Sequence, residues 1–311
     1  MSVALTSRTL PVGLRATVTV PASSANLGPG FDTLGLALGL YDDVSVETTD
    51  GGLTVTVEGE GAHEVPTDDG HLVVVALRRA LDHLGINAPG LNLKCVNRIP
   101  HSRGLGSSAA AAVAGIAAAA ALATDADASL GLTVTEMVQL SSEFEGHPDN
   151  ASASVLGGAV VSWTVPSNPT RYDARRLDVH PDIRAYAFVP DVQSSTSVTR
   201  GLLPSLVPHA DAAFNASRAA LMVLALTTDP DLLLEATQDR LHQGYRAESM
   251  KASFSLVEEL RTHRVAAAIS GAGPTVLALT TDSLPATLRE RAASAGFTVL
   301  ELPIADGVCR S

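Results

Sequence analysis

Lysine is almost absent from this sequence: Lys94 and Lys251 are the only two in 311 residues, and acidic side chains outnumber basic ones by 33 to 21. The formal net charge is therefore −12. Because a face that binds DNA or RNA must neutralise phosphates with many cationic side chains, this composition argues against a nucleic-acid partner.

Cysteine is also scarce. Cys95 and Cys309 cannot build a disulfide framework or a four-cysteine zinc site, which is typical of a protein in a reducing compartment. The first 14 residues lack the apolar stretch of a signal peptide. The one long apolar run, residues 109–123, is mostly alanine and too short to cross a bilayer. These features predict a soluble, cytoplasmic, acidic enzyme with no membrane partner.

The balance of residue types is that of a globular protein, with 46% hydrophobic and 17% charged residues. At about 150 residues per domain, the length predicts two domains. The segment Pro166-Ser167-Asn168-Pro169 is the predicted border, because proline interrupts both helices and sheets. We therefore expect domains at residues 1–165 and 166–311.

Residue periodicity predicts a mixed fold. Strands are expected at 16–21, 43–48 and 53–58, with Asp50-Gly51-Gly52 as the hairpin turn between the last two. Thr133 and Glu136 have the spacing of a capping box at the start of a helix that runs into Glu143. Strands and helices are interspersed, so the expected class is α+β. The other expected strands are 91–96, 159–165, 185–189, 265–269, 275–279 and 298–303, and the other expected helices are 71–84, the alanine-rich stretch, 210–226, 254–263 and 284–295.

A glycine- and serine-rich segment, Ile99 to Ala109, follows a predicted strand and opens the alanine-rich helix. The first turn of a helix leaves N–H groups unpaired at the positive end of its dipole, so it attracts phosphate. Gly104 and Gly106 let backbone N–H groups approach a phosphate closely, and the hydroxyls of Ser107 and Ser108 can bind it or its metal. The segment therefore predicts a phosphate-binding loop.

Other interpretations of this loop are weaker. A Walker A loop needs Gly-Lys followed by Ser or Thr, and neither lysine follows a glycine. Residues 104–109 match the dinucleotide pattern G-x-G-x-x-A, but a longer connection separates the strand from the first glycine than in that fold. A plain glycine turn with no ligand is the remaining alternative.

Two more glycine-containing segments stand at strand ends. Pro21 to Asp32 carries Asn26 and Asp32 around a Gly-Pro-Gly turn, which suits a small polar ligand. Ser270 to Thr275 joins two apolar strands near the C-terminus. Each segment alone is more often a simple turn, and the co-occurrence of all three favours a binding site.

Together, the three motifs resemble those of the GHMP family of small-molecule kinases in order and spacing, over about Thr17 to Leu302. The middle motif is shared by the whole family, including kinases of mevalonate and galactose. The first, Ser23 to Asp32, is similar to the version in members that act on L-homoserine. The resemblance implies a two-domain GHMP kinase fold, with an ATP-binding N-terminal domain like domain 2 of ribosomal protein S5, a ferredoxin-like C-terminal domain, and the active site between them.

The same resemblance implies an activity. It is phosphoryl transfer from ATP to the side-chain hydroxyl of L-homoserine, giving O-phospho-L-homoserine on the route to threonine, with Mg²⁺ as the cation. The expected partners are this small molecule and ATP, with a homodimer left open. The residues expected to bind ATP are Pro100, His101, Ser102, Arg103, Gly104, Leu105, Gly106, Ser107, Ser108, Ala109, Ala110, Gly271 and Gly273.

By resemblance, Ser108 and a glutamate from the following helix hold the metal. Glu143 and Glu145 are both candidates, and Glu143 is preferred. The segment from His147 to Asn150 lies where the sugar and mevalonate kinases of the family keep a catalytic aspartate. Members that act on homoserine resemble an exception in which no obvious base is required, so Asp149 and Asn150 are expected in the active site with an open role.

A zwitterionic substrate needs a cation for its carboxylate and acceptors for its ammonium group. The family pattern places carboxylate-binding arginines at Arg200 and Arg246, because a guanidinium pairs with a carboxylate through two hydrogen bonds. The residues expected to complete the substrate pocket are Asn26, Asp32, His147 and Thr196.

Two other functions stay open. Another GHMP kinase, for mevalonate, phosphomevalonate or a sugar, is the nearer alternative, and the paired arginines favour an amino acid instead. A non-catalytic sensor that binds ATP is the other, and the presence of Ser108, Glu143 and Asn150 together argues against it.

Overall fold

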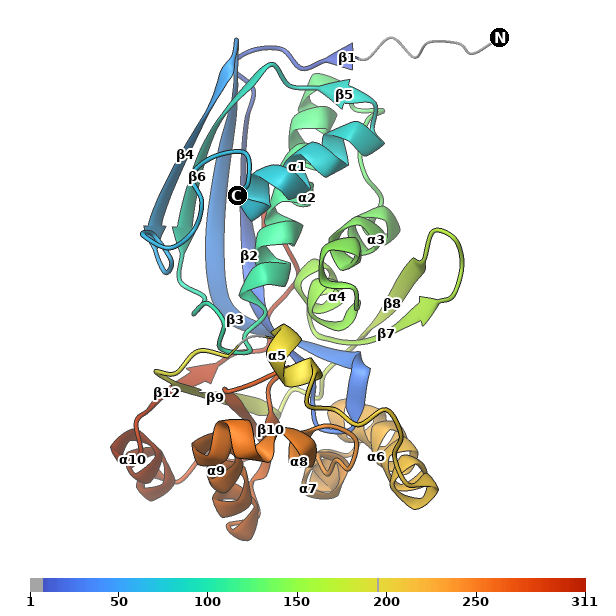
Figure 1. Ribbon diagram of the computed structural model, residues 1–311, viewed down its shortest axis with the longest axis vertical. Helices are drawn as coiled ribbons and strands as arrows, with labels where there is room; N and C mark the ends of the chain where they lie inside the picture. The colour runs from blue at the N-terminus through green and yellow to red at the C-terminus, as the bar shows by residue number, and fades with distance from the viewer. Residues whose placement is uncertain (1–7, 195) are drawn as a thin grey trace.

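The structure, a computed structural model, describes residues 8–194 and 196–311, without side-chain placement for residues 196 and 197. Its long axis joins two units, each built on its own sheet (Figure 1). The larger sheet has the order β13–β2–β3–β6–β4, and β7 and β8 extend it from the first half of β3. Its strands are β2 (Arg15–Asn26), β3 (Gly30–Thr49), β4 (Gly52–Gly59), β6 (Gly90–Asn97), β7 (Ala159–Val165), β8 (Arg171–Leu177) and β13 (Cys309–Arg310).

Strand β3 is central to this sheet, because different parts of its 20 residues pair with different strands. Residues 43–49 pair with β6, and residues 34–36 pair with β7. Val44 and Val46 alternate with partly exposed residues, which places one face of the strand on the core. The short β1 (Arg8–Thr9) pairs separately with β5 (Ile86–Asn87).

The expected hairpin around Asp50-Gly51-Gly52 is wrong. The strands β3 and β4 both form, but β6 lies between them, antiparallel to β3 and parallel to β4. Leu91, Leu93 and Cys95 of β6 are buried, so the central position places an apolar strand inside the sheet and leaves the more exposed β4 at its edge. This pairing joins segments that are distant in sequence.

Helices α1 (Leu72–His83), α2 (Ser107–Ala126), α3 (Val134–Glu145) and α4 (Asp149–Leu156) cover one face of the larger sheet (Figure 1). The predicted capping box between Thr133 and Glu136 is present at the start of α3. At Gly115 of α2, a Cβ atom would lie 2.3 Å from the carbonyl oxygen of Val73, so glycine permits the close packing of α1 on α2. By length and composition α2 could cross a membrane, but most of it is buried in this core.

The smaller sheet is antiparallel, with the order β10–β11–β9–β12. Its strands are β9 (Arg184–Pro190), β10 (Ala266–Ile269), β11 (Val276–Thr280) and β12 (Phe297–Leu302). A second cluster of buried side chains, including Tyr186, Phe188 and Leu260, lies between one face of this sheet and the helices α9 (Lys251–Thr262) and α10 (Ala286–Ser294). The other helices of this unit are α6 (His209–Thr227), α7 (Leu233–Ala236) and α8 (Gln243–Arg246), with 3₁₀ turns at Pro230–Leu232 and Ala247–Met250.

The expected domain border falls within a hairpin. Pro166 and Pro169 lie in the loop between β7 and β8, which pair with each other, so the larger sheet continues to Leu177. The chain end also returns to the larger sheet, where Cys309 of β13 pairs with Thr19. We therefore propose a border between β8 and β9, with the last residues belonging to the first unit. The short α5 (Thr196–Arg200) lies at the junction of the two units (Figure 1).

Candidate active site

The three glycine-containing motifs meet at the junction. The backbone N–H of Ser23 donates to the carbonyl of Leu105 at 3.0 Å, and the N–H of Gly271 donates to the carbonyl of Ala25 at 3.0 Å. The N–H of Thr275 donates to the carbonyl of Arg103 at 3.1 Å. Main-chain hydrogen bonds therefore hold the first motif against each of the other two.

The middle motif has the backbone form that phosphate binding needs. Gly104 and Gly106 adopt positive φ angles of 80° and 69°, and Gly106 directly precedes α2. A Cβ atom at Gly104 would lie 2.5 Å from the carbonyl oxygen of Ser270. Any residue larger than glycine would therefore push the middle motif away from the third motif. Among the described residues, no side chain caps the start of the 20-residue α2, and Ser107 and Ser108 of its first turn line cavities, so its first N–H groups can serve a bound anion.

Two adjacent cavities border this helix end. The first, of about 220 Å³, lies between the units and is lined by polar side chains that include Asp32, His147 and Arg200. The second, of about 270 Å³, lies between β3, α1 and α2. Ser102, Ser107 and Ser108 line both cavities, so the two cavities lie next to each other at the start of α2.

The second cavity was not predicted from sequence. Its wall includes Val44, Val65 and Val73, with His71 as a buried polar group. Among the residues that the structure describes, the Nδ1 atom of His71 has no hydrogen-bond partner. Burial, and then the charge of His101, lowers the pKa of His71, so its imidazole is neutral. A neutral imidazole in a largely apolar wall is compatible with a flat, uncharged ligand group.

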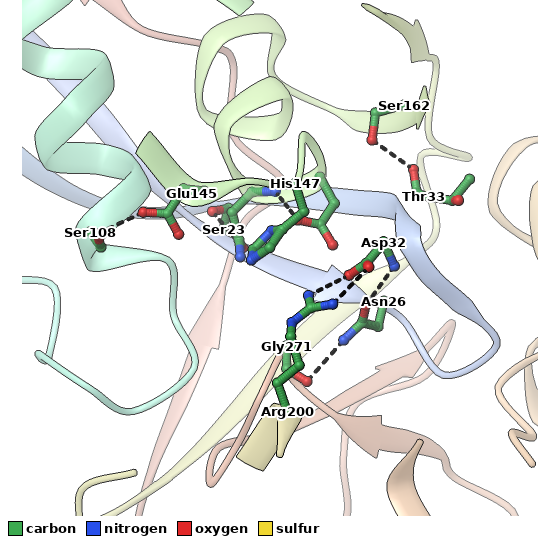
Figure 2. Close-up of polar contacts among 12 residues, drawn as sticks. Ser23, Asn26, Asp32, Thr33, Ser108, Glu145, His147, Ser162, Arg200 and Gly271 are labelled. Carbon is green, nitrogen blue, oxygen red and sulfur yellow. Dashed lines mark hydrogen bonds and ion pairs between the residues drawn. The ribbon is translucent and has the colours of Figure 1, made fainter. Parts of the chain in front are cut away.

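The structure places Glu145, rather than the preferred candidate Glu143, beside Ser108. Ser108 Oγ donates to Glu145 Oε1 at 2.6 Å, across the gap between α2 and the end of α3 (Figure 2). Glu143 instead pairs with Arg79 at 3.0 Å, outside the first cavity. Ser108 and Glu145 therefore form the oxygen pair beside the phosphate loop.

His147 and Asp149 form a second close pair. His147 Nδ1 lies 2.9 Å from Asp149 Oδ1, and the same carboxylate oxygen accepts the backbone N–H of Asn150 at 2.8 Å. Burial lowers the pKa of His147, but the hydrogen bond and charge of Asp149 raise it more, with help from Glu145 and Asp32. The net pKa lies above the ordinary 6.5. Asp149 is only 1% exposed, so its role includes holding the start of α4.

The predicted substrate residues Asn26, Asp32 and Arg200 are brought together (Figure 2). Arg200 donates to both carboxylate oxygens of Asp32, at 3.0 and 2.7 Å. Asn26 Oδ1 accepts the backbone N–H of Asp32 at 3.1 Å, and Asn26 Nδ2 donates to the carbonyl of Gly271 at 2.9 Å. The oxygen and the nitrogen of the Asn26 side-chain amide are thus both hydrogen-bonded, so Asn26 stabilises the conformation of the first motif.

Arg246 lies deeper than Arg200. It is 2% exposed, donates to the carbonyl of Thr199 at 3.1 Å, and has its guanidinium 5.7 Å from the centre of the Phe31 ring. The Arg200 guanidinium lies 5.2 Å from the same ring. Burial, and then the charge of Arg200, lowers the pKa of Arg246. Thr196, also predicted for this pocket, begins α5, but its side chain lies outside the described part of the structure.

Comparison with known proteins gives agreeing results. Residues 71–158 match the GHMP kinases N terminal domain, and residues 221–297 match the GHMP kinases C terminal domain. The chain is 62% identical over 304 residues to a homoserine kinase from Rhodococcus erythropolis, covering 96% of this chain and 97% of the relative. It is 56% identical over 306 residues to the homoserine kinase of Mycobacterium tuberculosis, covering 98% and 96%.

Solved structures share the fold. A homoserine kinase from Cytophaga hutchinsonii superposes with a TM-score of 0.81 at 24% identity, covering 100% of this chain and 99% of the other. A mevalonate diphosphate decarboxylase from Staphylococcus aureus superposes with a TM-score of 0.66 at 16% identity, covering 97% and 98%. The same fold thus occurs in proteins with different activities, so the function has to be argued from the site residues.

Proposed function

The chain belongs to the GHMP kinase family, and on that premise we propose that it transfers the γ-phosphoryl group of ATP to the side-chain hydroxyl of L-homoserine. The products are O-phospho-L-homoserine and ADP. The observation that carries the proposal is that the two cavities share Ser107 and Ser108, with a largely apolar wall on one side and paired opposite charges on the other.

The nucleotide fits with its base in the second cavity and its phosphates at the start of α2. Val44, Val65 and Val73 offer apolar contact to a purine ring, and the neutral imidazole of His71 lies in the same wall without adding a charge. The phosphates then face the N–H groups that follow Gly106, which favour negative charge. This pose directs the γ-phosphoryl group into the first cavity.

Magnesium fits the oxygen pair of Ser108 and Glu145, because Mg²⁺ prefers a carboxylate and hard oxygen ligands beside phosphates. Asp32, His147 and Asp149 also have ligand atoms within 4.8 Å of one another. That cluster is already hydrogen-bonded internally and to Arg200, so we assign the metal to Ser108 and Glu145. When bound, the ion would neutralise charge that develops on the phosphates.

The first cavity suits a zwitterion. The Asp32 carboxylate would receive the ammonium group of homoserine, and the Arg200 and Arg246 guanidinium groups would receive its carboxylate. The raised pKa of His147 makes a further cation available at the same wall. Mevalonate and sugars have no ammonium group to pair with Asp32, which favours an amino-acid substrate over those of the other GHMP kinases.

Transfer depends mainly on positioning and charge. The hydroxyl oxygen bonds to the γ-phosphorus, the bond from phosphorus to the bridging oxygen breaks, ADP leaves with the bonding electron pair, and the hydroxyl proton is released to water. The Oδ1 atom of Asp149 is already hydrogen-bonded to His147 and to the Asn150 N–H, which supports a positioning role.

A cytoplasmic location and a homodimer stay predictions.

Direct product identification tests this proposal. The purified protein, incubated with ATP, Mg²⁺ and L-homoserine, should give ADP and a phosphomonoester of homoserine in equal amounts by ³¹P NMR and mass spectrometry. ATP hydrolysis without a phosphorylated amino acid would contradict it. Nucleotide binding without any turnover would favour the sensor alternative.

A further inference from the structure

Ser23 is a buried hydroxyl that the proposed mechanism does not use. It lies on β2 within the first motif and is fully buried, and its backbone N–H already donates to Leu105 of the phosphate loop. Its side chain is directed toward the first turn of α4. A buried serine hydroxyl destabilises the folded protein unless it forms a hydrogen bond.

The partner is Asn150. Ser23 Oγ donates to Asn150 Oδ1 at 3.0 Å. Because the amide oxygen faces Ser23, the amide N–H₂ group is the part of Asn150 left to face the first cavity, which Asn150 lines. Ser154 Oγ lies 3.4 Å behind Ser23 Oγ and donates to the carbonyl of Pro21 at 3.1 Å, so a second hydroxyl supports the first.

The pair lies directly against the start of α2. A Cβ atom at Gly106 would be 2.2 Å from Ser23 Oγ and 3.2 Å from Asn150 Oδ1. The amide of Asn150 is therefore held beside the helix N–H groups that the phosphates are expected to meet. In that place an N–H donor stabilises the oxygens that take part in transfer, whereas an amide oxygen would repel them.

From this geometry we infer that Ser23 is a positioning residue: its hydroxyl fixes the Asn150 amide so that the N–H₂ group faces the point of phosphoryl transfer. The inference rests on the proposed function, and adds a residue to it that touches neither substrate. Ser23 acts only through Asn150. Its effect should therefore appear in kcat, which reports the transfer step, rather than in the KM for either substrate.

A double-mutant cycle tests this inference. Ser23→Ala should lower kcat by about tenfold or more, with both KM values within about threefold of those of the native protein. Asn150→Ala should lower kcat further. In the Asn150→Ala background, Ser23→Ala should have no additional effect on kcat, because the group that it positions is gone.

Ser162→Ala supplies the matched control. Ser162 is also fully buried and donates to a carbonyl, that of Thr33, at the same distance of 3.0 Å. This variant should have a melting temperature close to that of Ser23→Ala and a kcat near the native value. It should act independently of Asn150→Ala.

The outcomes separate the two claims. If the native protein phosphorylates homoserine but Ser23→Ala lowers kcat equally in both backgrounds, or leaves it unchanged, the positioning role is wrong and the proposed function stands. If the native protein gives no phosphohomoserine, the proposed function fails, and the inference fails with it.

Discussion

Arg200 and Asp32 lie 168 residues apart in sequence and form a bidentate ion pair at 3.0 and 2.7 Å. Both are proposed to bind the substrate, one through its carboxylate and the other through its ammonium group. A zwitterion entering the cavity would exchange partners with both, so neither charge is left unpaired before or after binding. The ion pair thus keeps two opposite charges ready in a site that must recognise both.

The first prediction concerns Arg200. Arg200→Leu should raise the KM for homoserine by about tenfold or more, because it removes the carboxylate partner and leaves Asp32 without its cation. The KM for ATP should change little, since Arg200 lies outside the second cavity. Steady-state kinetics on both substrates provide the measurement. A native KM for homoserine would remove Arg200 from the substrate pocket.

The second prediction separates the two glutamates. Glu145→Gln should lower kcat by about 10²-fold or more, because Glu145 and Ser108 are the oxygen pair proposed for the metal. Glu143→Gln is the control, and it should stay within about threefold of the native kcat, since Glu143 pairs with Arg79 at a partly exposed site. The opposite order of effects would return the metal to Glu143. Equal melting temperatures would show that neither loss reflects unfolding.

Sequence alone could not make that choice. Residues two apart on a helix point roughly 200° away from each other, so only one of Glu143 and Glu145 can face α2. Which one does depends on how α3 is rotated against its neighbours. The three glycine motifs, by contrast, were predictable because their conformations are local and their residue types are specific.

Long-range packing explains the other differences. The place of β6 between β3 and β4 depends on strand pairing across distant segments, which the local turn at Gly51 and Gly52 does not reveal. The second cavity is formed by β3, α1 and α2 together, so His71 carried no recognisable signal in the sequence. The prolines at 166 and 169 do interrupt the strands, but they lie in a loop within one sheet and not at the predicted domain border.

The third prediction uses the raised pKa of His147. Because the folded protein favours the protonated imidazole beside Asp149, the stability from this pair is fully present below the ordinary pKa of 6.5. It should be lost as the pH rises through the raised pKa. The difference in free energy of unfolding between the native protein and His147→Gln, measured by urea titration at several pH values, should therefore shrink toward alkaline pH. A difference that is constant or grows with pH would show that the pKa is not raised.

The fourth prediction concerns Asp149. Asp149→Asn should retain measurable turnover, because an amide oxygen can still accept from His147 and from the Asn150 N–H. Transfer through a loose transition state needs little early proton removal. A loss of about 10⁴-fold or more, with an intact fold and native KM values, would identify Asp149 as the general base.

The central claim is that the first cavity selects a zwitterionic amino acid and presents its hydroxyl to the nucleotide. ADP release measured over homoserine, homoserinol, mevalonate and galactose tests it most directly, because homoserinol keeps the reactive hydroxyl and lacks only the carboxylate. Homoserine should be turned over with a kcat/KM at least about tenfold above that of homoserinol, and mevalonate and galactose should give no significant turnover. Equal rates with homoserine and homoserinol, or preferred turnover of mevalonate or galactose, would contradict the account.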